Sequence, residues 1–145
     1  MSVYLDAGVL LAALAEDANT AAVDGFLSTA VTPLLVSDLA AAEVASALAG
    51  RVGALELSAP AARAILADFD SWRSADTEAI DLEAGDARAA GELARRLELG
   101  LQPAQALHLA ICLRTGASLM TFDRGLAAAA LALDLPVVGL TATGL

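Results

Sequence analysis

Short runs of apolar and β-branched residues recur along the chain, and longer helix-like segments separate them. We predict strands at residues 2–6, 32–37, 77–82, 117–123 and 135–140. Turn or cap residues flank the runs, and the runs themselves are too short for buried helices. The run "TPLLVS" at 32–37 is of the buried type, which is typical of a strand covered on both faces of a sheet.

Alanine- and leucine-rich segments between these strands predict helices, because both residues are strong helix formers. The predicted helices cover residues 8–17, 20–30, 39–52, 58–72, 83–99, 101–113 and 124–133. Pro103 suits the first turn of a helix, and Gly100 should end the helix before it. Strands that alternate with helices from end to end predict an α/β fold, in which a parallel sheet has helices on both faces. The length of 145 residues suits one domain over residues 1–145.

The composition narrows the class of protein. Hydrophobic residues make up 58% of the chain, yet no apolar run reaches the roughly 18–20 residues needed to cross a bilayer. Asp6 interrupts the first apolar segment and no basic residue precedes it, which argues against a secretory signal. The single cysteine, Cys112, excludes an internal disulfide and a cysteine zinc cluster. We expect a cytoplasmic protein without a membrane partner.

The charge of the chain excludes further functions. The net charge is −10, and the eight basic residues are all arginines. Without lysine there is no Walker A phosphate-binding loop, and a phosphotransfer site that relies on a catalytic lysine is disfavoured. Strong acidity also counts against binding nucleic acid by simple attraction to its phosphates. A protein of this charge that handles RNA or DNA needs bound cations or a local arginine patch.

Three acidic residues lie where chemistry is expected. Asp6 ends the first predicted strand and Asp123 ends the fourth, so both belong at the carboxyl rim of a parallel sheet, where ligands bind. Glu43 is the only acid in an apolar helix, and a buried carboxylate needs a cation or an arginine beside it. Mg²⁺ or Mn²⁺ suits such oxygen ligands. An aspartate after a strand is also a common helix cap, and Glu43 could reach solvent.

His108 interrupts another apolar helix. A buried histidine with a hydrogen-bond partner is a more frequent arrangement than a metal-binding histidine, and we expect the former.

Four segments carry a family resemblance: "VYLDAGVLLAAL", "SDLAAAEVASAL", "QALHLAICLRTGASLMTFDRGLAAAA" and "LPVV". In this order they resemble PIN-domain proteins, and most closely the VapC-like ribonuclease toxins of bacterial toxin–antitoxin pairs. The resemblance implies a three-layer α/β/α sandwich with a central, mostly parallel sheet of four to five strands. It also implies an acidic cluster that binds Mg²⁺ or Mn²⁺ and hydrolyses RNA, a small cognate antitoxin, and a homodimer.

The resemblance assigns the site residues one by one. Asp6 matches the first acid of the family, Glu43 the second, and Asp123 a late acid that follows the "TF" strand. Gln105 departs from the pattern, because the family usually reads "DALHLA" where this chain reads "QALHLA". A glutamine there could act as a weak ligand through its amide oxygen or bind a coordinated water. Arg124 could contact the RNA backbone or simply end a helix in solvent.

Two functions therefore remain in view from the sequence. The first is a Mg²⁺- or Mn²⁺-dependent ribonuclease that acts as a toxin, weakened by Gln105. The second is a catalytically silent PIN-fold module that binds an antitoxin-like partner or RNA without cleaving it. A phosphatase of the haloacid-dehalogenase type is disfavoured, because "DAG" after the first strand lacks the second aspartate and the chain has no lysine.

Overall fold

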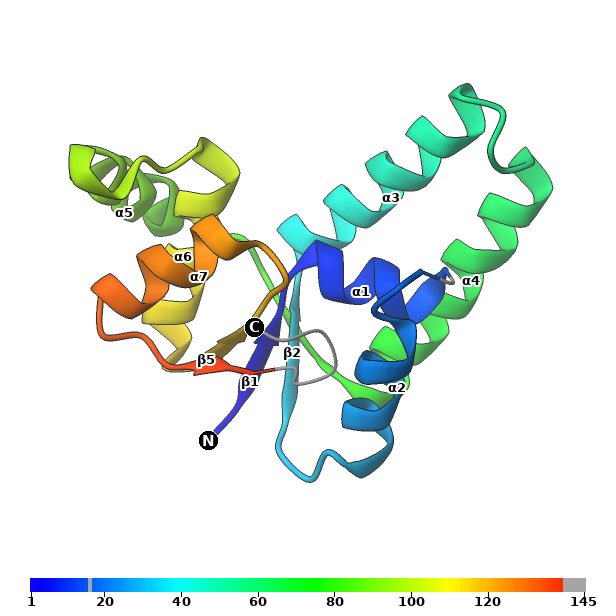
Figure 1. Ribbon diagram of the computed structural model, residues 1–145, viewed down its shortest axis with the longest axis horizontal. Helices are drawn as coiled ribbons and strands as arrows, with labels where there is room; N and C mark the ends of the chain where they lie inside the picture. Colours follow the sequence, from blue (N-terminus) through cyan, green and yellow to red (C-terminus); the bar gives the residue numbers. More distant parts are fainter. Residues whose placement is uncertain (16, 140–145) are drawn as a thin grey trace.

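The computed structural model of the protein describes residues 1–15 and 17–139 (Figure 1). Its strands form one sheet in the order β3-β2-β1-β4-β5, and every neighbouring pair is parallel. The strands are β1 (Val3–Leu5), β2 (Leu34–Ser37), β3 (Glu78–Ile80), β4 (Ser118–Met120) and β5 (Val137–Val138). Each lies within one predicted run. Glu16 of the predicted helix 8–17 and Leu140 of the predicted strand 135–140 lie outside the described residues.

Helices connect these strands throughout the described part of the chain. They are α1 (Ala7–Leu14), α2 (Thr20–Thr29), α3 (Asp38–Gly53), α4 (Ala59–Asp76), α5 (Ala84–Ala94), α6 (Pro103–Thr115) and α7 (Arg124–Ala132). A 3₁₀ turn, η1 (Leu97–Leu99), follows α5. In the described ranges, none of these helices has both the length and the apolar character needed to cross a membrane.

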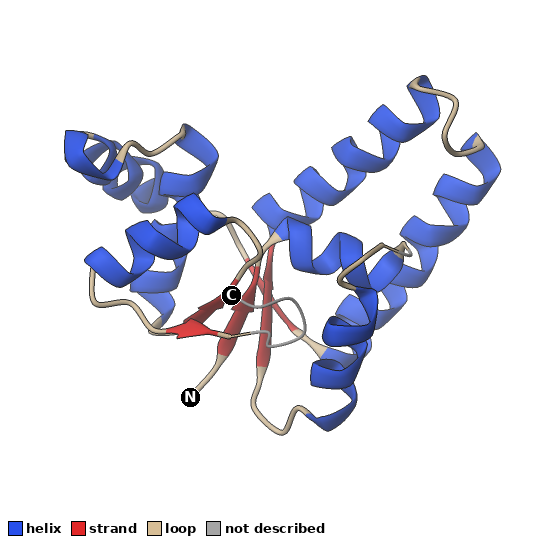
Figure 2. Ribbon diagram, viewed as in Figure 1, coloured by secondary structure: helices blue, strands red, loops and turns tan. Residues whose placement is uncertain are grey.

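The sheet separates two hydrophobic clusters, because alternate residues of each strand point to opposite faces. Val3 and Leu5 of β1 pack with α1, α2, α3 and α4 on one face. Tyr4, between them, packs with α6 and α7 on the other face, in what we call the second cluster. Figure 2 shows the helices on the two sides of the strands. The predicted three-layer α/β/α sandwich with a parallel sheet is therefore confirmed.

The prediction of one helix over residues 83–99 is wrong in its last part. The helix α5 ends at Ala94, and the N–H groups of Arg95 and Arg96 make shorter-range turn bonds to the carbonyls of Glu92 and Leu93. The turn η1 then ends at Gly100, whose φ of 59° lies in the left-handed region that favours glycine. This turn reverses the chain, so that Leu99 and Leu101 can pack against the second cluster.

Candidate active site

Two of the predicted acids are helix caps at the same rim of the sheet. Asp6 follows β1, and its Oδ1 accepts a hydrogen bond of 3.0 Å from the N–H of Val9 in α1. Asp123 lies beyond β4, and its Oδ1 accepts one of 3.0 Å from the N–H of Leu126 in α7. The strands β1 and β4 are hydrogen-bonded neighbours, so these carboxylates lie side by side beyond the carboxyl ends of the strands.

A pocket of about 230 Å³ brings the predicted site residues together. Asp6, Glu43, Asp123 and Gln105 all line it. The remaining lining residues are Ala7, Gly8, Ala104, His108 and Leu126. Arg124 is exposed in the first turn of α7 and does not line the pocket, although it follows Asp123 directly.

Asp6 is a buried carboxylate held by neutral donors. Asp6 is only 6% exposed. The Thr121 hydroxyl donates a hydrogen bond to Oδ2 of Asp6. Burial raises the pKa of Asp6 above its ordinary value, although the hydrogen bonds from Thr121 and Val9 oppose the shift. The charge of Asp123 adds a smaller upward effect to the pKa. Within the described residues, no arginine forms an ion pair with Asp6.

Asp123 is the more exposed carboxylate of the pair. Burial raises its pKa, but the hydrogen bonds from the Leu126 N–H and the Gln105 amide outweigh burial, so its pKa is lowered. Thr121 connects the two aspartates, because its hydroxyl donates to Asp6 and its Oγ1 accepts a bond of 2.9 Å from the Asp123 N–H. The sequence reasoning missed Thr121. Its position, two residues before Asp123, was the available signal.

Gln105 uses both ends of its amide. Oε1 accepts a 2.9 Å hydrogen bond from the N–H of Gln102, which caps α6, and Nε2 donates one of 3.0 Å to Oδ2 of Asp123. Gly125 lies beside this contact, since a Cβ there would be 3.4 Å from Oδ1 of Asp123 and 3.6 Å from Nε2 of Gln105. In this arrangement the amide oxygen is engaged by the helix end, and Gln105 presents a donor to Asp123.

Glu43 reaches the pocket from α3 and meets His108 of α6. Oε1 of Glu43 lies 2.5 Å from Nε2 of His108, and Nδ1 of His108 lies 2.6 Å from the Tyr4 hydroxyl. His108 is only 4% exposed, as expected of a hydrogen-bonded core histidine. It also lines the acidic pocket, three residues after Gln105 on the same face of α6.

The donor set of this pocket suits a hard divalent cation in its chemistry. Three carboxylates line it, one of them buried without a cationic partner in the described chain, and oxygen ligands of this kind bind Mg²⁺ or Mn²⁺. Among residues 1–15 and 17–139, no three histidine, cysteine, aspartate or glutamate side chains already stand as a metal-binding cluster. Each carboxylate is held by its own protein partner: Asp6 by Thr121, Glu43 by His108 and Asp123 by Gln105.

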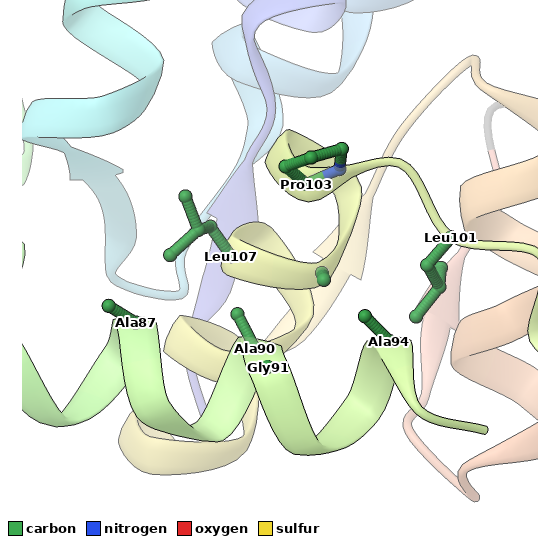
Figure 3. A pocket seen from close by; sticks show the side chains of 8 residues that line it. Ala87, Ala90, Gly91, Ala94, Leu101, Pro103 and Leu107 are labelled. Atoms are coloured by element: carbon green, nitrogen blue, oxygen red, sulfur yellow. The ribbon is translucent and has the colours of Figure 1, made fainter.

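A second pocket, of about 340 Å³, lies between α5 and α6 (Figure 3). It is lined by alanine, glycine, leucine and proline residues, including Ala90, Leu101 and Leu107. Among the residues that the structure describes, no titratable side chain lines it, so these residues offer no acid, base or metal ligand for chemistry. The acidic pocket is the candidate active site, because three carboxylates and His108 meet there.

The comparison with known families agrees with this architecture. The model of the PIN domain matches residues 3–131. The chain belongs to the PIN-domain family. No curated protein matches the sequence of this PIN-domain chain at a significant level.

Solved structures share the PIN fold at low sequence identity. One is the toxin VapC20 of Mycobacterium tuberculosis, described as cleaving the sarcin–ricin loop. Its TM-score is 0.72 at 20% identity, over 88% of this chain and 94% of that chain. FitAcB from Neisseria gonorrhoeae has a TM-score of 0.70 at 16% identity, over 95% and 97%. A toxin–antitoxin complex from Klebsiella pneumoniae has a TM-score of 0.60 at 15% identity, over 95% and 97%.

Proposed function

We propose that this PIN-domain chain is a divalent-cation-dependent endoribonuclease and the toxin of a toxin–antitoxin pair. The observation that carries the proposal is the meeting of Asp6, Glu43 and Asp123 in one pocket at the carboxyl rim of the sheet. These residues would hold Mg²⁺ or Mn²⁺. The bound cation would supply Lewis-acid chemistry, by polarising the phosphate and lowering the pKa of an attacking water.

The protein's own residues prepare the carboxylates for this role. Thr121 and Val9 hold the Asp6 carboxylate at the end of β1, and His108 contacts the Glu43 carboxylate of α3. Gln105 donates a hydrogen bond to Asp123, and the lowered pKa of Asp123 favours its anionic form. A pocket lined by carboxylates repels RNA phosphates until a cation is bound, so cation and substrate binding should be coupled. Arg124 is exposed at the start of α7 and directly follows Asp123 in the sequence. It is our candidate for an RNA backbone contact.

The toxin assignment rests on the solved structures that share this fold. Solved neighbours with the same fold include a protein described as a cleaving toxin and a toxin–antitoxin complex. We infer a homodimeric toxin with a small cognate antitoxin. The inhibiting segment of that antitoxin should be basic, because a guanidinium or ammonium group reaching three carboxylates would form charge-assisted hydrogen bonds.

The test is cleavage of structured and single-stranded RNA by the purified protein, with Mg²⁺ or Mn²⁺ and with a chelator. We expect cleavage only with the metal, and a loss of about 100-fold or more in Asp6→Asn, as is usual when a group that stabilises transition-state charge is removed. Asp68→Asn is the matched control, because Asp68 is exposed on α4 and is not among the residues that line the pocket. Equal cleavage by Asp6→Asn and the wild type would contradict the proposal.

One observation favours the alternative of a silent binding module. Gln105 supplies a neutral donor to Asp123. The resemblance to VapC-like toxins implies an acid at this position, so the pocket has one negative charge fewer than expected. If the wild type binds RNA or an antitoxin but shows no metal-dependent cleavage, the chain is a binding module with a PIN fold.

A further inference from the structure

A connected series of hydrogen bonds leads from the buried core to Glu43. Ser37, at the end of β2, lies with its Oγ 2.6 Å from the Tyr4 hydroxyl on β1. The Tyr4 hydroxyl lies 2.6 Å from Nδ1 of His108 on α6, and Nε2 of His108 lies 2.5 Å from Oε1 of Glu43 on α3. Ser37 and Tyr4 are 0% exposed and His108 is 4% exposed, so water does not compete for the two bonds among these three residues. The Glu43 side chain is partly exposed, so the series of bonds ends at the pocket surface.

One arrangement of the protons in this series of hydrogen bonds gives every donor an acceptor without adding a charge. Burial raises the pKa of Tyr4 far above its ordinary value, so its hydroxyl keeps its single proton. The Ser37 oxygen already accepts a 3.0 Å hydrogen bond from the Ala40 N–H, which caps α3. If Ser37 donates to the Tyr4 oxygen, Tyr4 donates to Nδ1 of His108, and the ring then carries its proton on Nε2, facing Glu43.

The arrangement in which these hydrogen bonds are donated in the opposite direction is less favourable. Tyr4 would donate to Ser37, and the Ser37 proton would lose the Tyr4 oxygen as its acceptor in a fully buried place. His108 would need a proton on both nitrogens to reach Tyr4 and Glu43 together. A buried donor without an acceptor is destabilising, which favours the first arrangement.

We propose that His108 is a positioning residue for the acidic pocket: the buried Ser37–Tyr4 pair sets its Nε2–H tautomer, and this N–H fixes the Glu43 carboxylate for cation binding. The inference rests on the proposed function, because it assigns a role at the same site. It makes α6 the element that holds two of the carboxylates, since Gln105 donates to Asp123 from the same helix face. Partners that orient a metal ligand typically change metal affinity by roughly 10–100-fold.

The first test needs neither metal nor activity. His108 is the only histidine and Tyr4 the only tyrosine of the chain, so ¹⁵N-histidine labelling gives the signals of one ring. In the metal-free wild type at neutral pH we expect an unprotonated Nδ1 and a protonated Nε2. Tyr4→Phe removes the donor to Nδ1 and should yield a mixture of tautomers. A ring protonated on Nδ1 in the wild type, or an unchanged ring in Tyr4→Phe, would overturn the proposal.

The second test measures Mn²⁺ affinity by calorimetry. His108→Leu should weaken binding about 10-fold or more, and His108→Gln should recover most of it, because the glutamine amide can return an N–H donor to Glu43. Ile111→Val is the control for a small loss of packing on the same helix, since Ile111 is buried in the second cluster and does not line the pocket. A wild type that binds Mn²⁺ without cleaving RNA would refute the ribonuclease alone. Equal affinities of His108→Leu and the wild type would refute the positioning role alone.

Discussion

Single residues at the rim serve the fold and the pocket at once. In Asp6 and Asp123 one carboxylate oxygen accepts the N–H that begins a helix, and the other oxygen accepts a side-chain donor, from Thr121 and Gln105 respectively. An Asp→Asn change keeps an acceptor for the helix cap while removing the charge. Asparagine variants therefore separate the chemical role of these residues from their structural role.

Gln105→Asp tests whether the amide has replaced an acid of the family. A fourth carboxylate in the pocket should tighten Mg²⁺ or Mn²⁺ binding by about 10-fold or more. Without metal the same change should lower the melting temperature, because another like charge enters a partly buried cluster and the donor to Asp123 is lost. Added Mg²⁺ should reverse this loss, since a ligand of the folded state stabilises it. Calorimetry, thermal unfolding and RNA cleavage give the three readouts.

The control for this change is Gln105→Asn, which has the length of aspartate without its charge. It should lower stability by the lost contact to Asp123 and should not tighten metal binding. If Gln105→Asp resembles Gln105→Asn in metal affinity and in its response to Mg²⁺, position 105 does not contribute to a cation site.

At the scale of the elements, strands and helices were predictable because local patterns decide them. The alternation of short apolar runs with alanine- and leucine-rich segments gave each strand, and Pro103 marked the start of α6. The end of α5 was not predictable in this way, since Leu97 and Leu99 continue the apolar pattern while Leu97 is 85% exposed. The chain leaves the helix there because Leu99 packs against the second cluster, which is a tertiary effect.

The candidate site was predictable only in part, for the same reason. The strand-end rule places Asp6 and Asp123 at one rim from the sequence alone. The partner of Glu43 cannot be found this way, because His108 is 65 residues away and Tyr4 is a further long-range contact, 104 residues from His108. Hydrogen bonds between distant elements leave no local pattern. The only trace is a histidine three residues after Gln105 in an apolar helix.

An ion pair joins α5 to α6 and supports the wall that carries Gln105 and His108. Arg114, near the end of α6, donates to both oxygens of Asp86 through Nε at 2.7 Å and Nη2 at 2.9 Å. Asp86 is only 1% exposed. Arg114→Ala should therefore destabilise the protein by about 3 kcal/mol, because a buried carboxylate loses its cation. This corresponds to a fall of roughly 10 °C in the melting temperature for a chain of this size.

The pH dependence of this effect follows from the pKa of Asp86. The hydrogen bonds from Arg114 lower that pKa in the folded protein, so the pair stabilises above the unfolded pKa, which is about 3.9 for aspartate. Its contribution is lost as the pH falls through the lowered folded value. The wild type and Arg114→Ala should therefore differ at neutral pH and converge in acid. Arg96→Ala, which breaks an exposed pair with Glu98, should change little at either pH, and a constant difference across pH would contradict this role for Arg114.

At the scale of the whole molecule, the net charge and the acidic pocket both agree with the proposed dependence on cations. The chain carries a net charge of −10 without a lysine, and its candidate site adds three carboxylates to one rim. Folding buries Asp6 beside Asp123, and this raises the free energy of the charged Asp6 carboxylate in the metal-free protein. Under the proposed function, the pocket would cost stability when empty and serve catalysis when filled, which is a common compromise between stability and activity.

Specific cation binding and general screening should affect the wild type and Asp6→Asn differently. At a Mg²⁺ concentration of about 100 times the dissociation constant, binding should stabilise the wild type by about 2.7 kcal/mol. Asp6→Asn should be more stable than the wild type without metal, because it removes a buried charge, and should gain little from Mg²⁺. Sodium chloride at matched ionic strength should raise both melting temperatures alike, since it only screens the repulsion within an acidic protein. The order of stability of the two proteins should thus reverse when Mg²⁺ is added and return with a chelator. If Mg²⁺ raises both equally, it acts by screening, and the acidic pocket does not bind the cation.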